Sequence, residues 1–444
     1  MLAKSKSPIL LLLLISASVS VSQPLAVNKA HLLALTEELK FDGDSIAVVD
    51  IYSNYPAYEP VDAKGEGFAC VDDAARAAVF FMRYNEVYGK SEDEKIIRGL
   101  INFVLRMQTS DGRFYNFLQR SGGEIQINES GRTSYACFGW WAARAIWALG
   151  EASTYFKNRN HEMYVEVVSA AERSLPQLDS ILTNYDRLDS LGYPTWLLYN
   201  DGGDAASELV LGLNRLYSAT GDKRYLKMSE EFCDGMMRLQ SGSRRTRPYS
   251  MFLSNHDGWH GWANSQSAAI LEYSRLANDR SVAEKALQEL ESFFPRWAGS
   301  LFFRSCDRTG RNLDYSGQIA YAIQPAVSAA AEAFEITHDR RFKTLASILA
   351  SWFLGNNTAK TGFYNSGSGI CFDGTEDSLH VNRNSGAEST IEALLTMVDL
   401  KRLGADFKSI KLISRPSFDA ERYIYEIDGR KVIFKMNATG FSIQ

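Results

Sequence analysis

Along most of the chain, apolar residues recur at helical spacing, and two kinds of helical segment alternate. The first kind is rich in alanine and other small apolar residues, as expected of helices buried on nearly all sides. Their starts lie roughly sixty residues apart, and such a period indicates a repeat architecture. These segments are Asp72–Tyr88, Thr133–Leu149, Asp204–Thr220, Trp262–Asn278, Gln318–Thr337 and Gly386–Leu403.

The second kind of segment carries more charge and keeps its apolar residues at i, i+3, i+4 and i+7, which is typical of a helix with one exposed face. These segments are Val27–Lys40, Glu92–Gln108, His161–Leu182, Lys223–Gln240, Val282–Phe294 and Arg340–Phe353. Six buried helices alternating with six polar-faced ones predict an all-α fold for residues 23–405, an (α/α)6 toroid of six helical hairpins. An open helical solenoid is the alternative, but closure at six repeats and long loops before the inner helices favour the ring.

The pattern changes near residue 406. Ile410–Ser414, Arg422–Ile427 and Lys431–Met436 are alternating, β-rich segments, and Asp428-Gly429 is a strong hairpin turn. We therefore expect residues 406–444 to form a small β-hairpin appendage on the toroid.

The first 22 residues have the features of a signal peptide. Lys4 and Lys6 precede the unbroken apolar run Ile9–Ile15, and small residues follow it. The run is too short for a comfortable membrane span. We expect a secreted or periplasmic protein with no membrane span after cleavage.

The composition narrows the class of protein. With 45% hydrophobic residues in 444, the chain is an ordinary packed globule, and disorder is excluded. A net charge of −5 argues against nucleic acid as a partner. The five cysteines show no zinc-binding spacing, so we expect no metal and no cofactor. We expect a monomer.

The candidate chemistry lies at the starts of the inner helices. In the toroid these helices run parallel, so their N-termini and the loops before them converge on one central cavity. The catalytic candidates at these starts are Asp72, Asp73, Asp204 and Glu388. Helix capping, or for Asp72 an ion pair with Arg76, is the structural alternative. Several acids facing one cleft is what glycoside hydrolysis requires, because one acid protonates the leaving oxygen and another activates water or attacks.

The loop Ser254–Trp262 concentrates histidine, aspartate and tryptophan between glycines. Tryptophan faces stack on sugar rings while neighbouring polar groups bind hydroxyls, and two histidines are too few ligands for a metal. The substrate-binding candidates in this loop are Asn255, His256, Asp257, Trp259, His260 and Trp262. Other inner loops add Arg132, Tyr315, Asp373 and Asn384.

Two motifs resemble those of bacterial six-hairpin glycosidase-like domains. Val71–Ala77 is similar to the VDDxARA signature of that family. The stretches Trp352–Asn356, Cys371–Gly374 and Val381–Thr390 are similar to its WFxGN, DG and VNxNxGAEST ending. The resemblance spans roughly residues 50–404 and implies an (α/α)6 toroid that acts on carbohydrate, with Asp72, Asp73 and Glu388 as motif residues. This chain departs from the family in having Ala74 where asparagine is common.

These observations predict a secreted carbohydrate-active enzyme acting on an oligo- or polysaccharide, a glycoside hydrolase with paired carboxylates in the central cavity. One alternative is a polysaccharide lyase, for which Asn255, His256, Tyr249, His260 and the basic run Arg244–Arg247 supply the residue types. The other is a glycan-binding protein without catalysis.

Overall fold

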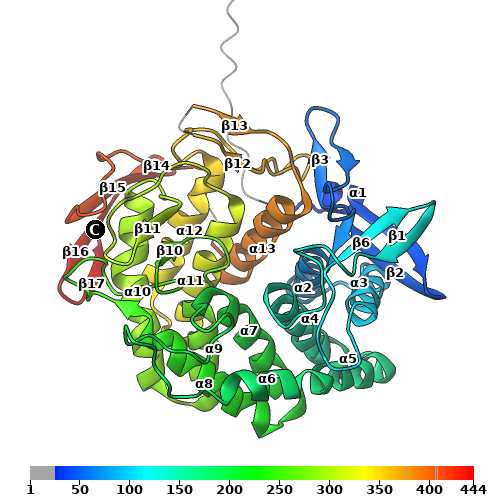
Figure 1. Cartoon of the computed structure of the whole chain (residues 1–444). Coiled ribbons are helices and arrows are strands. Elements are labelled where there is room, and N and C mark those ends of the chain that lie inside the picture. Colours follow the sequence, from blue (N-terminus) through cyan, green and yellow to red (C-terminus); the bar gives the residue numbers. More distant parts are fainter. Residues whose placement is uncertain (1–25, 378, 406, 408) are drawn as a thin grey trace, which may run out of the picture.

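Helices form two concentric layers in the computed structural model, which describes residues 26–377, 379–405, 407 and 409–444 (Figure 1). The expected signal peptide at residues 1–22 lies outside this range. Within it, each inner helix packs on the next and α13 packs on α2, so the ring is closed. The inner helices are α2 (Val71–Tyr88), α4 (Trp140–Phe156), α7 (Gly203–Thr220), α9 (Gln266–Ala277), α11 (Ile323–Thr337) and α13 (Ala387–Leu403). The predicted (α/α)6 toroid is confirmed.

The outer layer covers the inner ring with amphipathic helices. Aspartates begin three of them, because the side chains of Asp222, Asp279 and Asp339 each accept a hydrogen bond from a backbone N–H of the first turn. Among the described helices, none is long and apolar enough to span a membrane. The outer helices are α3 (Glu94–Arg106), α5 (His161–Arg173), α6 (Leu175–Leu182), α8 (Lys223–Arg238), α10 (Arg280–Gly299) and α12 (Arg340–Ala350).

The predicted first outer helix, Val27–Lys40, is wrong. Only α1 (Ala30–Ala34) is helical, and β1 (Thr36–Phe41) then pairs with β2 (Asp44–Val49). The turn Asp42-Gly43 explains the difference, since both residues have positive φ (48° and 85°) and a two-residue turn of this kind matches the twist of a hairpin.

Three inner helices begin later than predicted. The α4 helix starts at Trp140 and leaves Thr133 in the preceding loop, where Phe114 and Cys137 exchange backbone hydrogen bonds. The α9 helix starts at Gln266 and not at Trp262, and the α11 helix starts at Ile323 and not at Gln318. These differences fall at the face of the ring where the inner helices begin, so they change which residues surround the cavity.

Glycines set the spacing between α4 and α7. A Cβ atom at Gly212 would lie 2.4 Å from the carbonyl oxygen of Ile146, and one at Gly150 would lie 2.4 Å from the carbonyl oxygen of Gly212. The two backbones can therefore approach this closely only with glycine at both positions.

Short strands and 3-10 turns build the loops between the helices. They brace these loops at the edges of the ring. They are β3 (Tyr52–Asn54), β4 (Glu59–Val61), β5 (Ala69–Cys70), β6 (Phe117–Ser121), β7 (Glu124–Ile127), β8 (Gln240–Ser241), β9 (Met251–Phe252), β10 (Gly258–His260), β11 (Ser305–Asp307), η1 (Ala320–Ala322), η2 (Ser351–Leu354), β12 (Gly374–Thr375) and β13 (Val381–Asn382).

The C-terminal residues form a four-stranded antiparallel sheet, one strand larger than expected. Asp428-Gly429 makes the predicted turn, again with positive φ at both residues (49° and 76°). Tyr423 is buried against Gly299 at the end of α10, which seats the sheet on the outer layer. The strands are β14 (Ile410–Leu412), β15 (Arg422–Ile427), β16 (Arg430–Asn437) and β17 (Gly440–Ile443), in that order.

Candidate active site

A cavity of about 490 Å³ lies where α2, α4 and α13 begin. Its wall combines acids, aromatic rings and hydrogen-bonding side chains, a mixture that suits a polar ligand with apolar faces. The positive ends of the helix dipoles meet here and favour negative charge. The lining residues include Tyr52, Glu66, Asp72, Asp73, Arg76, Asn116, Thr133, Trp140, Trp141, Asp373, Glu388 and Ser389.

Asp72 and Glu388 are the acids held least tightly in this wall. An Asp72 oxygen lies 3.4 Å from Nε of Arg144, and a Glu388 oxygen lies 3.4 Å from Nη2 of Arg76. Their side chains stay 30% and 44% exposed. Both carboxyls are therefore accessible to a molecule in the cavity.

The other acids of the wall are engaged by close partners. Asp73 accepts from Nη2 of Arg76 at 2.7 Å and from the thiol of Cys70. Asp373 accepts from the backbone N–H of Gly386 at 2.8 Å and from the hydroxyl of Ser389 at 2.7 Å, so it secures the start of α13. Asp73 is thus a buried ion-pair partner that also lines the cavity, and its catalytic role stays a prediction. Asp373 has a structural role besides lining the cavity.

One helical turn beyond Asp72 and Glu388, four charged side chains lie next to the cavity, and one of them, Arg76, lines it. Arg76 Nη1 donates to Glu392 at 2.8 Å, and Arg144 Nη1 lies 3.0 Å from Glu208. All four are buried. These four residues, the floor charges, come from α2, α4, α7 and α13 and link four of the inner helices through ion pairs.

Tyr321, in η1, packs against both arginines of the floor. Its ring centroid lies 4.8 Å from the guanidinium carbon of Arg76 and 4.9 Å from that of Arg144. Cation–π contacts of this kind are strongest where the cation is desolvated. Tyr321 therefore fixes the height of both guanidinium groups under the rim acids.

Burial controls the protonation of the acids around the cavity. Although 44% of its side chain is exposed, the protein atoms around Glu388 displace water from its carboxyl group, and this desolvation raises its pKa above the ordinary 4.5; Arg76 opposes the shift, and Asp73 and Asp72 reinforce it. Burial also raises the pKa of Glu392 to about 7, although Arg76 opposes the shift. A rim glutamate that keeps its proton to higher pH than usual is suited to general acid catalysis.

Asp204 is buried at the start of α7 and contacts a histidine. Its Oδ2 lies 2.9 Å from Nε2 of His260, while Nδ1 of His260 lies 3.2 Å from the carbonyl oxygen of Trp262. Both ring nitrogens of His260 therefore face oxygen atoms, one from a carboxyl group and one from a backbone carbonyl. The Trp262 ring stacks on the imidazole at 3.7 Å. Sequence analysis grouped Asp204, His260 and Trp262 at one site. The structure brings these three together, but none of them lines the cavity that Asp72 and Glu388 share.

The rest of the Ser254–Trp262 loop is structural. His256 bonds Asp201 at 2.6 Å, which joins this loop to the one before α7. Asn255 accepts from the backbone N–H of Asp257 within a turn. Trp259 is 3% exposed and packs on core aromatic rings, so its prediction as a sugar-binding residue is wrong.

Three further predicted binding residues lie apart from the two acids. Arg132 is exposed and does not line the cavity. Tyr315 packs edge-on against Phe303. Asn384 accepts from the backbone N–H of Tyr55 and so ties β3–β4 to the loop before α13. We correct these three to structural or peripheral positions, because none of them lines the cavity.

The residue set for a lyase is not assembled. Arg247 and the hydroxyl of Tyr249 both bind Asp419, beside the C-terminal sheet. Arg244 binds Glu291 of α10. These side chains serve the outer layer, and none of them contacts His260.

Sequence analysis missed Trp140, Trp141, Arg144 and Tyr52. One signal could have revealed the floor charges, since Arg76, Arg144, Glu208 and Glu392 each lie four residues after a residue at the start of an inner helix. A spacing of four keeps two residues on one face of a helix. A charge at that position in an otherwise apolar helix therefore points to the cavity.

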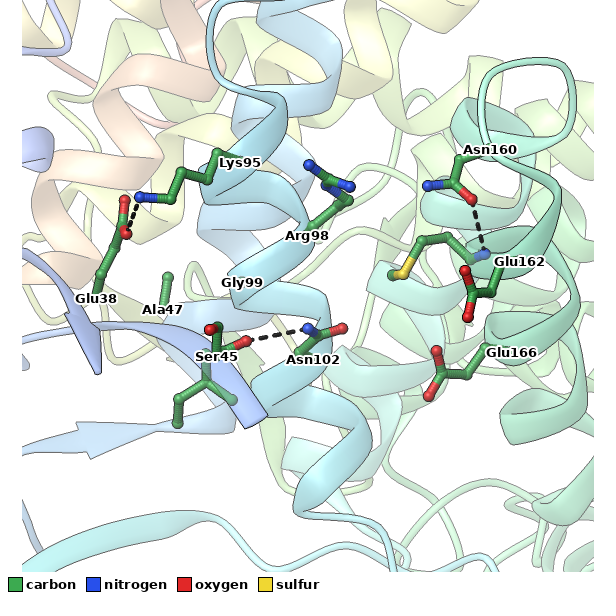
Figure 2. A pocket seen from close by; sticks show the side chains of 12 residues that line it. Glu38, Ser45, Ala47, Lys95, Arg98, Gly99, Asn102, Asn160, Glu162 and Glu166 are labelled. Carbon is green, nitrogen blue, oxygen red and sulfur yellow. Dashed lines mark hydrogen bonds and ion pairs between the residues drawn. The ribbon is translucent and has the colours of Figure 1, made fainter. Parts of the chain in front are cut away.

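A second hollow, of about 430 Å³, lies outside the ring between β2, α3 and α5 (Figure 2). Glu38 pairs with Lys95 at one edge, and Asn102 donates to the carbonyl oxygen of Ser45. None of its lining residues, all within the described chain, is aromatic. It offers no surface for sugar stacking, so the central cavity is the candidate active site.

No protein-family model matches the chain, and no curated protein matches it either. Solved structures with a similar fold are enzymes that process sugars. A sugar epimerase from a ruminal bacterium has 14% identity and a TM-score of 0.56, over 80% of this chain and 92% of that one. The cellobiose 2-epimerase of Bacillus thermoamylovorans has 13% identity and a TM-score of 0.58, over 83% and 95%. A glycoside hydrolase family 9 endoglucanase has 16% identity and a TM-score of 0.50, over 85% and 77%. These neighbours are (α/α)6 toroid enzymes, the fold class of this chain.

Proposed function

We propose that this protein is a glycoside hydrolase whose reaction takes place between Asp72 and Glu388. The observation that carries the proposal is the pair of accessible acids at the rim of an aromatic cavity. Glycosidases use two carboxyl groups that flank the scissile bond. The motif resemblance at Val71–Ala77 and Val381–Thr390 supports the same class, and so do the sugar-processing neighbours of the fold.

The two acids differ in environment, and this assigns their roles. The raised pKa of Glu388 suits the general acid, which must hold a proton for the leaving oxygen. Asp72 then serves as the base for water or as the nucleophile. Arg144 is buried with its Nε 3.4 Å from an Asp72 oxygen, so it places a positive charge beside that carboxyl group.

An Asp72→Asn variant tests the proposal on a panel of polysaccharides and aryl glycosides. We expect the wild type to release reducing sugar from at least one member and the variant to be slower by about 10²-fold or more, because an amide neither accepts a proton nor attacks. Asp186→Asn is the matched control, since Asp186 is an exposed acid that pairs with Arg238 and does not line the cavity. Equal rates for the wild type and Asp72→Asn would contradict the assignment, and binding without turnover would favour a lectin-like protein.

A sugar epimerase is the second candidate, because His260 lies 2.9 Å from the carboxyl group of Asp204 and stacks on the half-buried ring of Trp262. A histidine oriented by a carboxylate can remove and return a proton at carbon. Incubation of the protein with cellobiose, mannose and glucose in D2O separates the two functions. An epimerase would place deuterium on the carbon next to the anomeric centre, as proton NMR would show, and His260→Asn would abolish the exchange. A hydrolase would leave these sugars unlabelled.

A further inference from the structure

Half-exposed tyrosines lie in or next to the wall of the candidate active site, and the function proposed above does not use them: Tyr52 lines the cavity, and Tyr135 and Tyr199 contact its lining residues Trp141 and Trp140. Tyr52, Tyr55, Tyr135 and Tyr199 are between 48% and 54% exposed. Exposed aromatic rings in such numbers mark a binding surface more often than a solvated one. We call these four residues, together with Trp140, the aromatic rim.

Tyr199 is held in place by three independent features. Its backbone has a φ of 56°, which is unfavourable for a bulky side chain. Its hydroxyl accepts a hydrogen bond from the backbone N–H of Trp140 at 2.9 Å, at the free start of α4. A Cβ atom at residue 139 would lie 2.2 Å from that hydroxyl, so Gly139 is needed for the contact. Strain of this kind points to a function for the exposed ring that it positions.

A second ring of the rim is braced in a different way. Tyr135 contacts Trp141 edge-on, with the ring centroids 5.9 Å apart. The Trp141 indole N–H donates to the carbonyl oxygen of Phe114 and is itself fixed. The orientation of Tyr135 is therefore set before any ligand binds, which lowers the entropy cost of binding.

Aromatic side chains reach the cavity from two directions, from β3 beside the loop before α13 and from α4. Tyr52 lines the cavity from β3 and lies against the loop before α13, while the neighbouring Tyr55 binds Asn384 through its backbone N–H. Trp140 lines the cavity from α4. In the ring, α2 with Asp72 packs between α13, whose preceding loop Tyr52 contacts, and α4, which carries Trp140.

We propose that the aromatic rim binds several consecutive sugar units on both sides of the scissile bond. The substrate is then a polysaccharide or long oligosaccharide that is cut internally. This inference rests on the proposed function, because the bond to be cut lies between Asp72 and Glu388. Tyrosine and tryptophan suit this ligand, since their faces stack on sugar C–H surfaces and their polar edges bind hydroxyls or water.

Binding to a catalytically inactive Asp72→Asn/Glu388→Gln protein tests the rim separately from the reaction. The probes are cello-, manno-, xylo- and malto-oligosaccharides, each from disaccharide to octasaccharide, titrated by calorimetry. On at least one series we expect the Kd to fall about tenfold or more between disaccharide and hexasaccharide. Added to this protein, Tyr199→Ala and Tyr135→Ala are each expected to raise the hexasaccharide Kd about tenfold. Tyr199→Phe, which keeps the ring, is expected to retain most of the affinity.

Tyr185→Ala is the matched control, because Tyr185 is an exposed tyrosine that packs on Trp196 in the outer layer. Circular dichroism confirms folding of each variant, and Tyr135→Ala provides an independent test if Tyr199→Ala does not fold. The proposal that the aromatic rim binds several sugar units would be overturned by any of three results. These are affinity that is independent of chain length, affinity that is unchanged in both tyrosine variants, and no binding in any of the four series. Length-dependent binding without cleavage by the wild type would instead overturn the proposed hydrolase function and support the proposed role of the aromatic rim. Cleavage that releases only terminal sugar units would support the hydrolase function and overturn the proposal that the substrate is cut internally.

Discussion

Replacement of Glu388 by glutamine is expected to slow cleavage of an unactivated glycan by about 10³- to 10⁴-fold. The change keeps the size of the side chain and its 3.4 Å approach to Arg76, but it removes the proton that the leaving oxygen needs. A sugar alkoxide is a poor leaving group, so the reaction depends strongly on that proton. Initial rates on the best substrate of the panel, for wild type and variant at equal concentration, measure the effect.

A glycoside with a dinitrophenyl leaving group isolates this role. Because dinitrophenolate departs without protonation, Glu388→Gln should lose far less activity on it than on the glycan. Asp72→Asn should lose activity on both substrates, since water must still be activated or the anomeric carbon attacked. Equal losses on the two substrates for Glu388→Gln would show that Glu388 is not the acid.

The pH dependence of the activity gives a second test of Glu388 as the general acid. The pKa of Glu388 is raised in the folded protein, so its proton is retained above the usual glutamate value of 4.5 and is lost only at higher pH. Activity should therefore fall on the alkaline side of the profile, with a midpoint above 4.5. This fall should be absent for Glu388→Gln on the dinitrophenyl glycoside.

The ring could be predicted from the sequence because its cause is local. Helices rich in small residues recur at a regular period, and the sequence of each one predicts that it is buried even when the neighbouring helices are unknown. The β1–β2 hairpin was missed for a similarly local reason, because the Asp42-Gly43 turn outweighs helical spacing over a short segment. The starts of α4 and α9 depend instead on long-range contacts, such as the pairing of Phe114 with Cys137, and no local pattern shows them.

The site residues also separate into those that a local sequence pattern predicts and those that depend on long-range packing. Asp72, Asp204 and Glu388 were predicted because acids at helix starts are conspicuous, and the toroid brings the starts together. Asp73 has the same signal as Asp72, but the next turn of α2 directs it to Arg76. Trp259 was misassigned because a tryptophan in a polar loop is not distinguishable, from sequence, from one that turns into the core. Side-chain direction, which decides both cases, is set by tertiary packing.

The two-level arrangement of the cavity explains why the rim acids can stay accessible. The floor arginines oppose, from below, the effect of burial on the pKa of Glu388, and Tyr321 holds both guanidinium groups in place. Close salt bridges at the rim itself would have blocked the acids. Because the arginines lie one helical turn further along, they support the acids electrostatically and leave them free to contact the substrate. Their ion pairs also link the inner helices.

Arg76→Met is expected to destabilise the fold by about 3–5 kcal/mol, since removing one partner of a buried ion pair leaves uncompensated charge. Methionine fills much of the space, but Asp73 and Glu392 lose the guanidinium that each contacts within 2.8 Å. Denaturant unfolding of the variant and the wild type measures the difference. Arg113→Met is the matched control, because Arg113 pairs with Asp111 at the surface, and such pairs contribute little.

The loss of unfolding free energy in Arg76→Met, its stability deficit, should also depend on pH. The direction of this dependence follows from the raised pKa of Glu392. The pKa of Glu392 is about 7 in the folded protein against 4.5 for an ordinary glutamate, and loss of Arg76 raises it further. A group with a raised pKa stabilises the fold fully below its unfolded value and loses that stabilisation as the pH rises through the folded value. The deficit should therefore be small near pH 5 and grow toward pH 8. Because Glu392→Gln removes the orphaned charge, Arg76→Met/Glu392→Gln should recover part of the loss at pH 8. A deficit that is constant from pH 5 to 8 would mean that packing, not charge, is the role of Arg76.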